Sequence, residues 1–236
     1  MAIPETVESE IVVGMWDRGL LGFPQGGITL KSGRQSPYYY NDRLSLSFDW
    51  QRDRDGRMSI GQQIAFRKVL ARGYATRFRE LECKPHHVLG KAQAATAPAA
   101  VGAYEADMSY LVERVDEPGK SYGAHQKIEG TYEEGQVVVL GDDVVTDARS
   151  KQEGAQILRD VGLIPAAVTI KFDREEGGMQ ALESFGFEAN AVTGLSKAML
   201  YLQAAGRIGN QELDAIAAYH EGLRIDGITT TYSAPA

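Results

Sequence analysis

The chain has 236 residues, of which 43% are hydrophobic and 24% charged, so it is long enough for one domain with a hydrophobic core. A formal net charge of −7 argues against general nucleic-acid binding, which needs a basic face, although a local cluster of Lys and Arg could still bind an anionic substrate. The single cysteine, Cys83, excludes an intramolecular disulfide. Because no run approaches the roughly 18 apolar residues of a membrane span, and the acidic N-terminus does not resemble a signal peptide, we expect no membrane partner and a cytoplasmic location.

Residues 1–58 predict a small N-terminal unit, a hood made of one helix and one hairpin. Apolar residues recur at helical spacing over residues 4–21. Glycines then interrupt the chain before a short strand at 28–30, and a Ser-Gly turn follows. Residues 38–40 are expected to form the second strand of the hairpin.

Residues 59–194 predict a parallel α/β core, and residues 195–236 predict C-terminal helices with a tail. A long helix at 60–81 precedes alternating strands and helices up to residue 192, which indicates βαβ units. The expected strands are 86–90, 110–112, 137–143, 166–172 and 189–192, and the expected helices between them are 92–104, 150–161 and 179–185. Two further helices are expected at 195–205 and 211–223, with frayed residues from 229 onward.

The segment of residues 137–150 carries the strongest functional signal. An unbroken apolar run from Val137 to Leu140 is typical of a strand that is covered on both faces. Asp142 and Asp143 follow at its carboxyl end, which is where ligands bind in open α/β sheets. Paired carboxylates there suit ribose hydroxyls or a Mg²⁺-bound pyrophosphate, and the loop at the next helix N-terminus suits a phosphate. The same acids could instead only cap that helix.

Three consecutive tyrosines in the hood also suggest a ligand contact. Tyr38, Tyr39 and Tyr40 cannot all face one core, because neighbouring side chains on a strand alternate between its faces. At least one ring must therefore point away and be available to stack on a flat base. Lys31, beside a glycine turn, adds a flexible cation. An aromatic hairpin packed only for stability is the alternative.

This hood segment, Leu30-Lys-Ser-Gly-Arg-Gln-Ser-Pro-Tyr-Tyr-Tyr-Asn41, resembles the L-K-S-G-R-x-S-P-Y-F-F-N segment of orotate phosphoribosyltransferases. The resemblance implies that Lys31 reaches the side of the phosphoribosyl pyrophosphate (PRPP). It also implies that Tyr39 and Tyr40 contact the orotate base.

Residues 137–150 resemble the type I phosphoribosyltransferase signature, which is a strand, two acidic residues and V-x-T-T-G-x-S. The resemblance implies that Asp142 and Asp143 address the ribose hydroxyls. Through water they would also face a Mg²⁺ ion that is held mainly by PRPP, with no direct protein ligand. The 5′-phosphate loop would consist of Thr146, Asp147, Ala148, Arg149 and Ser150.

Two more segments resemble the same family. Residues 170–178 are similar to its D-R-x-E-G segment, which implies that Arg174 binds orotate through its guanidinium fork. The alternative is a surface arginine that pairs with Glu175 or Glu176. Arg114 and Lys120 loosely match the family's flexible catalytic loop, which implies that they reach the pyrophosphate across a dimer interface.

The phosphate-binding segments also depart from the family pattern. Ala148 stands where the family has glycine, and Asp147 adds a negative charge. In the expected pyrophosphate loop after residue 90, the second lysine of the family's motif is missing, and Lys91 lies three positions earlier. A departing pyrophosphate needs compensating positive charge in the transition state, so these changes bear on turnover more than on fold.

Together these features predict a type I phosphoribosyltransferase-like α/β fold, with a parallel sheet flanked by helices and a small N-terminal hood. The resemblance implies transfer of a phosphoribosyl group from PRPP to orotate, with Mg²⁺, by a homodimer whose active sites are shared across its interface. Two alternatives stay open. One is a non-catalytic regulatory paralogue that binds PRPP or a nucleotide, and the other is a phosphoribosyltransferase that acts on another base.

Overall fold

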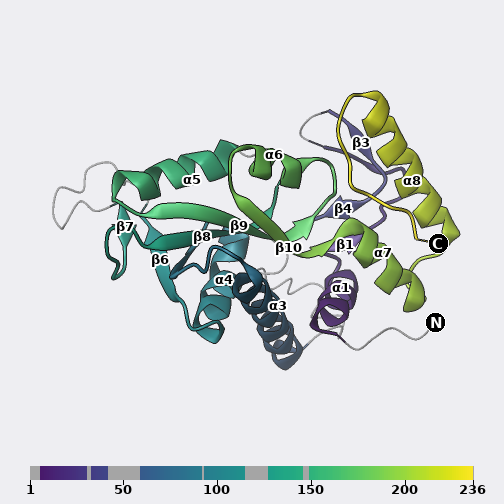
Figure 1. Cartoon of the computed structure of the whole chain (residues 1–236). Helices are drawn as coiled ribbons and strands as arrows, with labels where there is room; N and C mark the ends of the chain where they lie inside the picture. The colour runs from purple at the N-terminus through teal and green to yellow at the C-terminus, as the bar shows by residue number, and fades with distance from the viewer. Residues whose placement is uncertain are drawn as a thin grey trace, which may run out of the picture.

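A computed structural model describes residues 6–30, 33–41, 59–91, 93–114, 127–145 and 149–235. Its central sheet consists of β5 (His87–Gly90), β6 (Ser109–Glu113), β7 (Ile128–Glu129), β8 (Val137–Val144), β9 (Ile164–Asp173) and β10 (Glu188–Gly194). The strand order is β10-β9-β8-β5-β6-β7 (Figure 1). All neighbours in this sheet pair in parallel except β6 with β7. The parallel α/β core is therefore confirmed.

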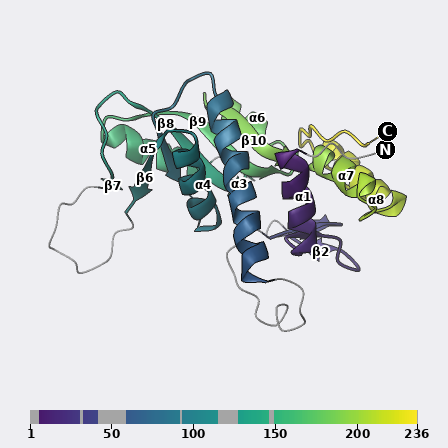
Figure 2. The same ribbon diagram turned by 90° about the horizontal axis from the view of Figure 1, so that it is seen from below.

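Helices cover both faces of the sheet. Successive side chains of the inner strands point to opposite faces, so each inner strand contributes to two hydrophobic clusters. Val139 of β8 belongs to one hydrophobic cluster, whereas Val138 and Leu140 belong to the other. The first cluster is covered by α1 (Val7–Asp17), α3 (Ile60–Glu80), α4 (Gln93–Glu105), α7 (Leu195–Ala204) and α8 (Asn210–Ile225). The second is covered by α5 (Arg149–Asp160) and α6 (Gly178–Ser184). Figure 2 shows α1, α3 and α4 side by side.

Within the described residues of the hood there are four short strands, which are β1 (Leu21–Gly22), β2 (Ile28–Thr29), β3 (Gln35–Ser36) and β4 (Tyr39–Tyr40). The expected hairpin exists, but its second strand is β3, so the prediction of residues 38–40 in that position is wrong. Pro37 interrupts the chain after β3, and β4 then pairs with β1 instead. This pairing places the tyrosines beside the end of α1 and not at the hairpin turn.

The long helix α3 continues through Gly73, where a helix break was conceivable. A Cβ atom at Gly73 would lie 2.6 Å from Ile11 Cδ1 and 2.7 Å from Val192 Cγ1. The glycine therefore allows α3 to approach α1 and β10 closely.

The C-terminal tail is ordered by tertiary contacts, so the expectation that it is frayed from residue 229 is wrong. The side chain of Tyr232 is only 4% exposed, and its ring stacks on that of His220 at 4.5 Å between centroids. Thr231 N donates to Glu175 O at 3.2 Å. These contacts bring the chain end back to the carboxyl end of β9. Within the described ranges, no helix is long and apolar enough to cross a membrane.

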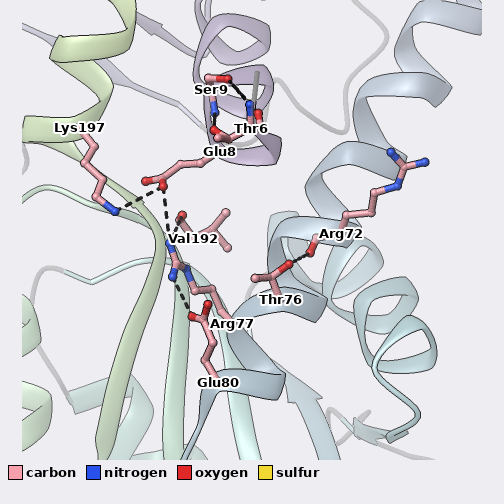
Figure 3. Close-up of polar contacts among 9 residues, drawn as sticks. All are labelled: Thr6, Glu8, Ser9, Arg72, Thr76, Arg77, Glu80, Val192 and Lys197. Atoms are coloured by element: carbon pink, nitrogen blue, oxygen red, sulfur yellow. Dashed lines mark hydrogen bonds and ion pairs between the residues drawn. The ribbon is translucent and has the colours of Figure 1, made fainter. Parts of the chain in front are cut away.

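A charged cluster fastens the hood helix to the core (Figure 3). Arg77 Nη2 of α3 lies 3.6 Å from Glu8 Oε2 of α1 and also donates to Val192 O at 3.3 Å. Lys197 of α7 lies 3.4 Å from the same Glu8 oxygen, and Arg77 Nη1 lies 2.7 Å from Glu80 Oε2. Arg77 is therefore the common partner of α1 and β10.

We expect Arg77→Met to lower the free energy of unfolding by about 1–2 kcal/mol, because the half-buried Glu8 carboxylate and the Val192 carbonyl both lose a donor. Arg72→Met is the matched control, since Arg72 lies on the same helix with an exposed side chain. It should change stability by less than about 0.5 kcal/mol. Urea unfolding of both variants measures the difference, and equal stabilities would contradict the role of the cluster.

Candidate active site

The sheet topology makes the carboxyl ends of β5 and β8 the place where a ligand is expected to bind. From β5 the chain passes to β6 on one side and then to β8 on the other, which makes the carboxyl ends of β5 and β8 a topological switch point. Lys91 follows β5 directly, and its N–H donates to Gly141 O of β8 at 2.9 Å. Asp142 and Asp143 close β8 beside this contact, so both acids lie at the edge of the sheet where ligands bind.

Asp142 is 4% exposed and is paired with a buried lysine. Lys151 Nζ of α5 lies 2.5 Å from Asp142 Oδ2 and donates to Val144 O at 3.2 Å. Tyr74 donates its hydroxyl to Asp142 O at 2.7 Å. Asp142 therefore fastens the first turn of α5 to the end of β8. The sequence reasoning missed Lys151, because a lysine near a helix start is usually solvated.

Asp143 is half-buried and continues the strand end. Its N–H donates to Asp142 Oδ1 at 2.8 Å, and its own Oδ1 accepts from Val144 N at 2.8 Å. These local hydrogen bonds orient both carboxylates without using all of their acceptor capacity. Contact of either acid with a ribose stays a prediction.

The remaining predicted phosphate groups are only partly described. Lys31, Lys120, Thr146, Asp147 and Ala148 lie outside the described residues, as do the side chains of Arg149 and Ser150 at the start of α5. Their roles remain predictions.

The described cations on the pyrophosphate side are paired with acids. Lys91 Nζ forms an ion pair with Glu113 of β6. Arg114 Nη1 lies 3.6 Å from Glu129 Oε1 of β7. A polyanionic ligand at this edge would therefore meet lysine and arginine side chains whose charge is already partly compensated.

The three tyrosines do face different ways, as the alternation argument predicts. Tyr38 is buried, whereas Tyr39 is 38% exposed. Tyr40 stacks on Phe172 of β9, with ring centroids 4.5 Å apart and planes at 20°. Tyr39 is thus the ring most open to a ligand, and Tyr40 also has a packing role that joins the hood to β9.

Arg174 follows β9 and is only 7% exposed. Its Nε donates to Glu176 Oε1 at 2.9 Å and its Nη2 lies 2.8 Å from the same oxygen, while the guanidinium lies over the Tyr38 ring at 4.7 Å. Burial opposes the charge, but Tyr38 and Glu176 raise the pKa of Arg174 above its ordinary value. Pairing with Glu176 is therefore correct, but the alternative of a surface arginine is wrong.

Glu176 joins three parts of the molecule. Besides Arg174, its Oε1 accepts from Tyr38 Oη of the hood at 3.0 Å and from Tyr219 Oη of α8 at 3.3 Å. The sequence reasoning considered Glu176 only as a partner of Arg174, since the approach of Tyr219 depends on the tertiary fold.

Glu175 lies in a strained turn at the same strand end. Its φ of 58° is left-handed, and its carboxylate accepts from Ser196 N at 3.0 Å and from the Ser196 hydroxyl. Burial raises the pKa of Glu175 to about 7, although hydrogen bonds from Ser196 act against this shift. Its neighbour Asp173 also has a raised pKa, mainly through burial.

The adjacent histidines His86 and His87 both have polar partners within the protein. His87 Nε2 lies 2.6 Å from Gln136 Oε1, and His86 Nδ1 accepts from Val137 N at 3.1 Å. Among the residues that the structure describes, no group of three His, Cys, Asp or Glu could hold a metal ion.

Comparison with protein-family models gives no match. The orotate phosphoribosyltransferase of Methylococcus capsulatus is 30% identical over 207 residues, which is 82% of this chain and 87% of that protein. The orotate phosphoribosyltransferase of Methanocella arvoryzae is 29% identical over 195 residues, covering 83% and 99%. The chain spans only 21% of the bifunctional enzyme PyrF/PyrE of Nostoc, to which it is 33% identical over 99 residues.

Solved structures agree with these relatives. The UMP synthase of Leishmania donovani superposes with a TM-score of 0.71 and 25% identity, over 91% of this chain and 42% of that chain. The orotate phosphoribosyltransferase of Francisella tularensis gives 0.68 at 20% identity, over 89% and 97%. The fold is that of a type I phosphoribosyltransferase. Within this class, the chain belongs to the orotate phosphoribosyltransferase family.

Removing Lys151 should expose the cost of an unpaired buried acid. We expect Lys151→Met to lower the free energy of unfolding by about 3 kcal/mol, because the Asp142 carboxylate loses its cation. The double variant Lys151→Met with Asp142→Asn should recover most of this loss. Thermal or urea unfolding of the four proteins in the cycle gives the coupling energy, and additive effects would show that the pair contributes nothing.

The raised pKa of Glu175 predicts a pH-dependent stability. The folded-state pKa of Glu175, about 7, exceeds its ordinary value of 4.5. Protonation of Glu175 therefore contributes stability that is fully present below pH 4.5 and is lost as the pH rises through 7. Relative to the parent, Glu175→Gln should therefore gain stability between pH 5 and 8, on the order of 2 kcal/mol. Asp173 is present in both proteins, so its contribution cancels when the stability-versus-pH curve of the parent is subtracted from that of the variant.

Glu183→Gln is the control for this measurement, since Glu183 is exposed on α6. Its stability difference from the parent should not change with pH. A constant difference for Glu175→Gln as well would refute the assignment.

Proposed function

We propose that the chain transfers a phosphoribosyl group from PRPP to orotate, giving orotidine monophosphate and pyrophosphate. The observation that carries the proposal is the placement of Asp142 and Asp143 at the end of β8, next to a buried Arg174 at the end of the adjacent β9. Carboxylates suit ribose hydroxyls, and a guanidinium suits the paired oxygens of a base that bears a carboxylate. Membership of the orotate phosphoribosyltransferase family supports the same reaction.

The reaction breaks the bond between the anomeric carbon and pyrophosphate and forms a bond from that carbon to a ring nitrogen of orotate, whose proton passes to the departing pyrophosphate or to solvent. Positive charge develops on the ribose, and negative charge develops on the leaving group. Asp142 and Asp143 would hold the ribose hydroxyls, and Lys31, Arg114 and Lys120 would compensate the pyrophosphate. Positioning and electrostatic stabilisation therefore account for the catalysis, without covalent participation of the protein.

The carboxylates at the end of β8 fit a Mg²⁺ ion that arrives with PRPP. Mg²⁺ commonly binds through one or two carboxylates together with substrate phosphates and water. Asp142, which also pairs with Lys151, and Asp143 would both face the ion through water. When bound, Mg²⁺ would offset the charge of the pyrophosphate.

We extend the proposal to a homodimer with shared active sites in the cytoplasm. A groove of about 160 Å³ between α3 and α4 is lined by Ile64, Leu70, Ala97, Pro98 and Val101, together with the stems of Arg67 and Lys68. Ile64 and Val101 are both exposed. An apolar strip of this kind supports contact with a second copy. The net charge of −7 supports the absence of a nucleic-acid partner.

One observation favours a second candidate, a regulatory protein that binds PRPP or a nucleotide without turnover. Lys91, Arg114 and Lys151 are each paired with an acid. If these pairs persist with ligand bound, the leaving pyrophosphate receives less compensation than catalysis needs. Binding without turnover would then be the expected behaviour.

The proposed function predicts that orotate absorbance falls when the protein is mixed with orotate, PRPP and Mg²⁺. Asp142→Asn and Asp143→Asn should each lower kcat/KM by about tenfold or more, because each removes a charged acceptor for the ribose. Asp214→Asn is the control, since Asp214 is exposed on α8. Calorimetric binding of PRPP without turnover would instead favour the regulatory candidate. Turnover with another base but not with orotate would show a different base specificity.

A further inference from the structure

The chain end, residues 228–233, returns from α8 to the turn that follows β9. We call these residues the tail segment, which is yellow in Figure 1. The Thr230 hydroxyl and Thr231 N–H both donate to Glu175 O, the latter at 3.2 Å. Thr229 O lies only 2.7 Å from the position of a Cβ atom on Gly177. The tail segment therefore contacts the turn on both sides of Glu176.

Further contacts hold the tail segment in place. The ring of Tyr232 stacks on buried His220 of α8, and His220 Nδ1 lies 2.6 Å from Thr230 Oγ1. Ser233 N donates to Ser196 Oγ at 2.9 Å, and Ser196 in turn donates to the Glu175 carboxylate. The segment is thus anchored independently to α8 and α7, so it can transmit a fixed position to the turn.

The turn needs such support because its backbone is strained. Glu175 has a φ of 58°, a left-handed conformation that is unfavourable for a non-glycine residue and persists only when its surroundings hold it. Asp173 Oδ1 accepts from Glu175 N at 2.8 Å, and the two threonines bind Glu175 O. Both polar groups of this strained backbone are therefore occupied. The conformation of Glu175 decides how Arg174 and Glu176, its two neighbours, are directed.

We propose that Thr230 and Thr231 are positioning residues for the base, which act through the Glu175 turn on Arg174. The inference rests on the proposed function, in which Arg174 binds orotate. In the proposed function PRPP binds at the end of β8, whereas the tail segment contacts the turn that follows β9. Loosening the tail segment should therefore weaken the affinity for the base selectively.

The test compares three single variants by steady-state kinetics. Thr230→Val removes the hydroxyl at nearly constant volume, and we expect it to raise the orotate KM by about threefold to tenfold, as the loss of one hydrogen bond does. The PRPP KM and kcat should stay within about twofold of the parent. Thr230→Ser should restore the orotate KM. Thr229→Val is the matched control, because the Thr229 side chain is exposed.

Equal changes in both KM values and kcat, or an unchanged orotate KM in Thr230→Val, would overturn the proposal. Hydrogen exchange of the amides of residues 174–177 supplies a readout that needs no turnover, and it should be faster in Thr230→Val than in the parent and the control. If the parent has no activity with orotate, the proposed function fails by itself. Exchange that is unchanged in Thr230→Val would then refute the positioning role as well.

Discussion

The buried guanidinium of Arg174 imposes the constraint on which this end of the molecule depends. A charge that is only 7% exposed is tolerated when it is paired and hydrogen-bonded, because desolvation of an isolated ion costs several kcal/mol. Glu176 provides the pairing, and Glu176 is itself held by hydroxyls from Tyr38 and Tyr219. The hood, the sheet and α8 must therefore all be in place before this charge is stable. Loss of any one of them leaves a buried ion with incomplete compensation.

A second set of compensated charges lies at the switch point. Asp142 with Lys151 and Lys91 with Glu113 place two lysines and two acids around the ends of β5, β6 and β8. Such pairs keep the local net charge at these strand ends close to zero when no polyanion is bound. A phosphate ligand that enters would compete with Asp142 and Glu113 for the same lysines, which links ligand affinity to the stability of the strand ends.

The sequence predicts those parts of the fold that depend on local pattern. The apolar run before Asp142 predicts β8, and the alternation of tyrosines predicts that Tyr39 faces away from Tyr38. Both predictions rest on periodicities that the backbone enforces. The helix at 60–81 is likewise recovered as α3 from its spacing.

What the sequence could not predict depends on contacts between distant segments. Thr230 and Glu175 are 55 residues apart, and Thr-rich chain ends are commonly disordered, so nothing local indicates an ordered tail. The sequence around Lys151 is typical of a solvated helix start, and only the tertiary fold places Asp142 beside it. The sequence does not reveal the true second strand of the hairpin, because Gln35–Ser36 is too short to show the alternation of a strand.

The strained turn needs an external anchor because Glu176 and an incoming anion would compete for the Arg174 guanidinium. In the proposed function, the guanidinium would meet the carboxylate of orotate while two of its nitrogens already face Glu176. A mobile turn would let the Glu176 carboxylate move together with the Arg174 guanidinium and keep its donors occupied. Glu176 would also repel the incoming anion. A turn held from the tail segment would keep Glu176 against Tyr38 and Tyr219, which both donate to its carboxylate. In the proposed function, affinity for the base would then depend on the rigidity of the turn as well as on the charge that it carries.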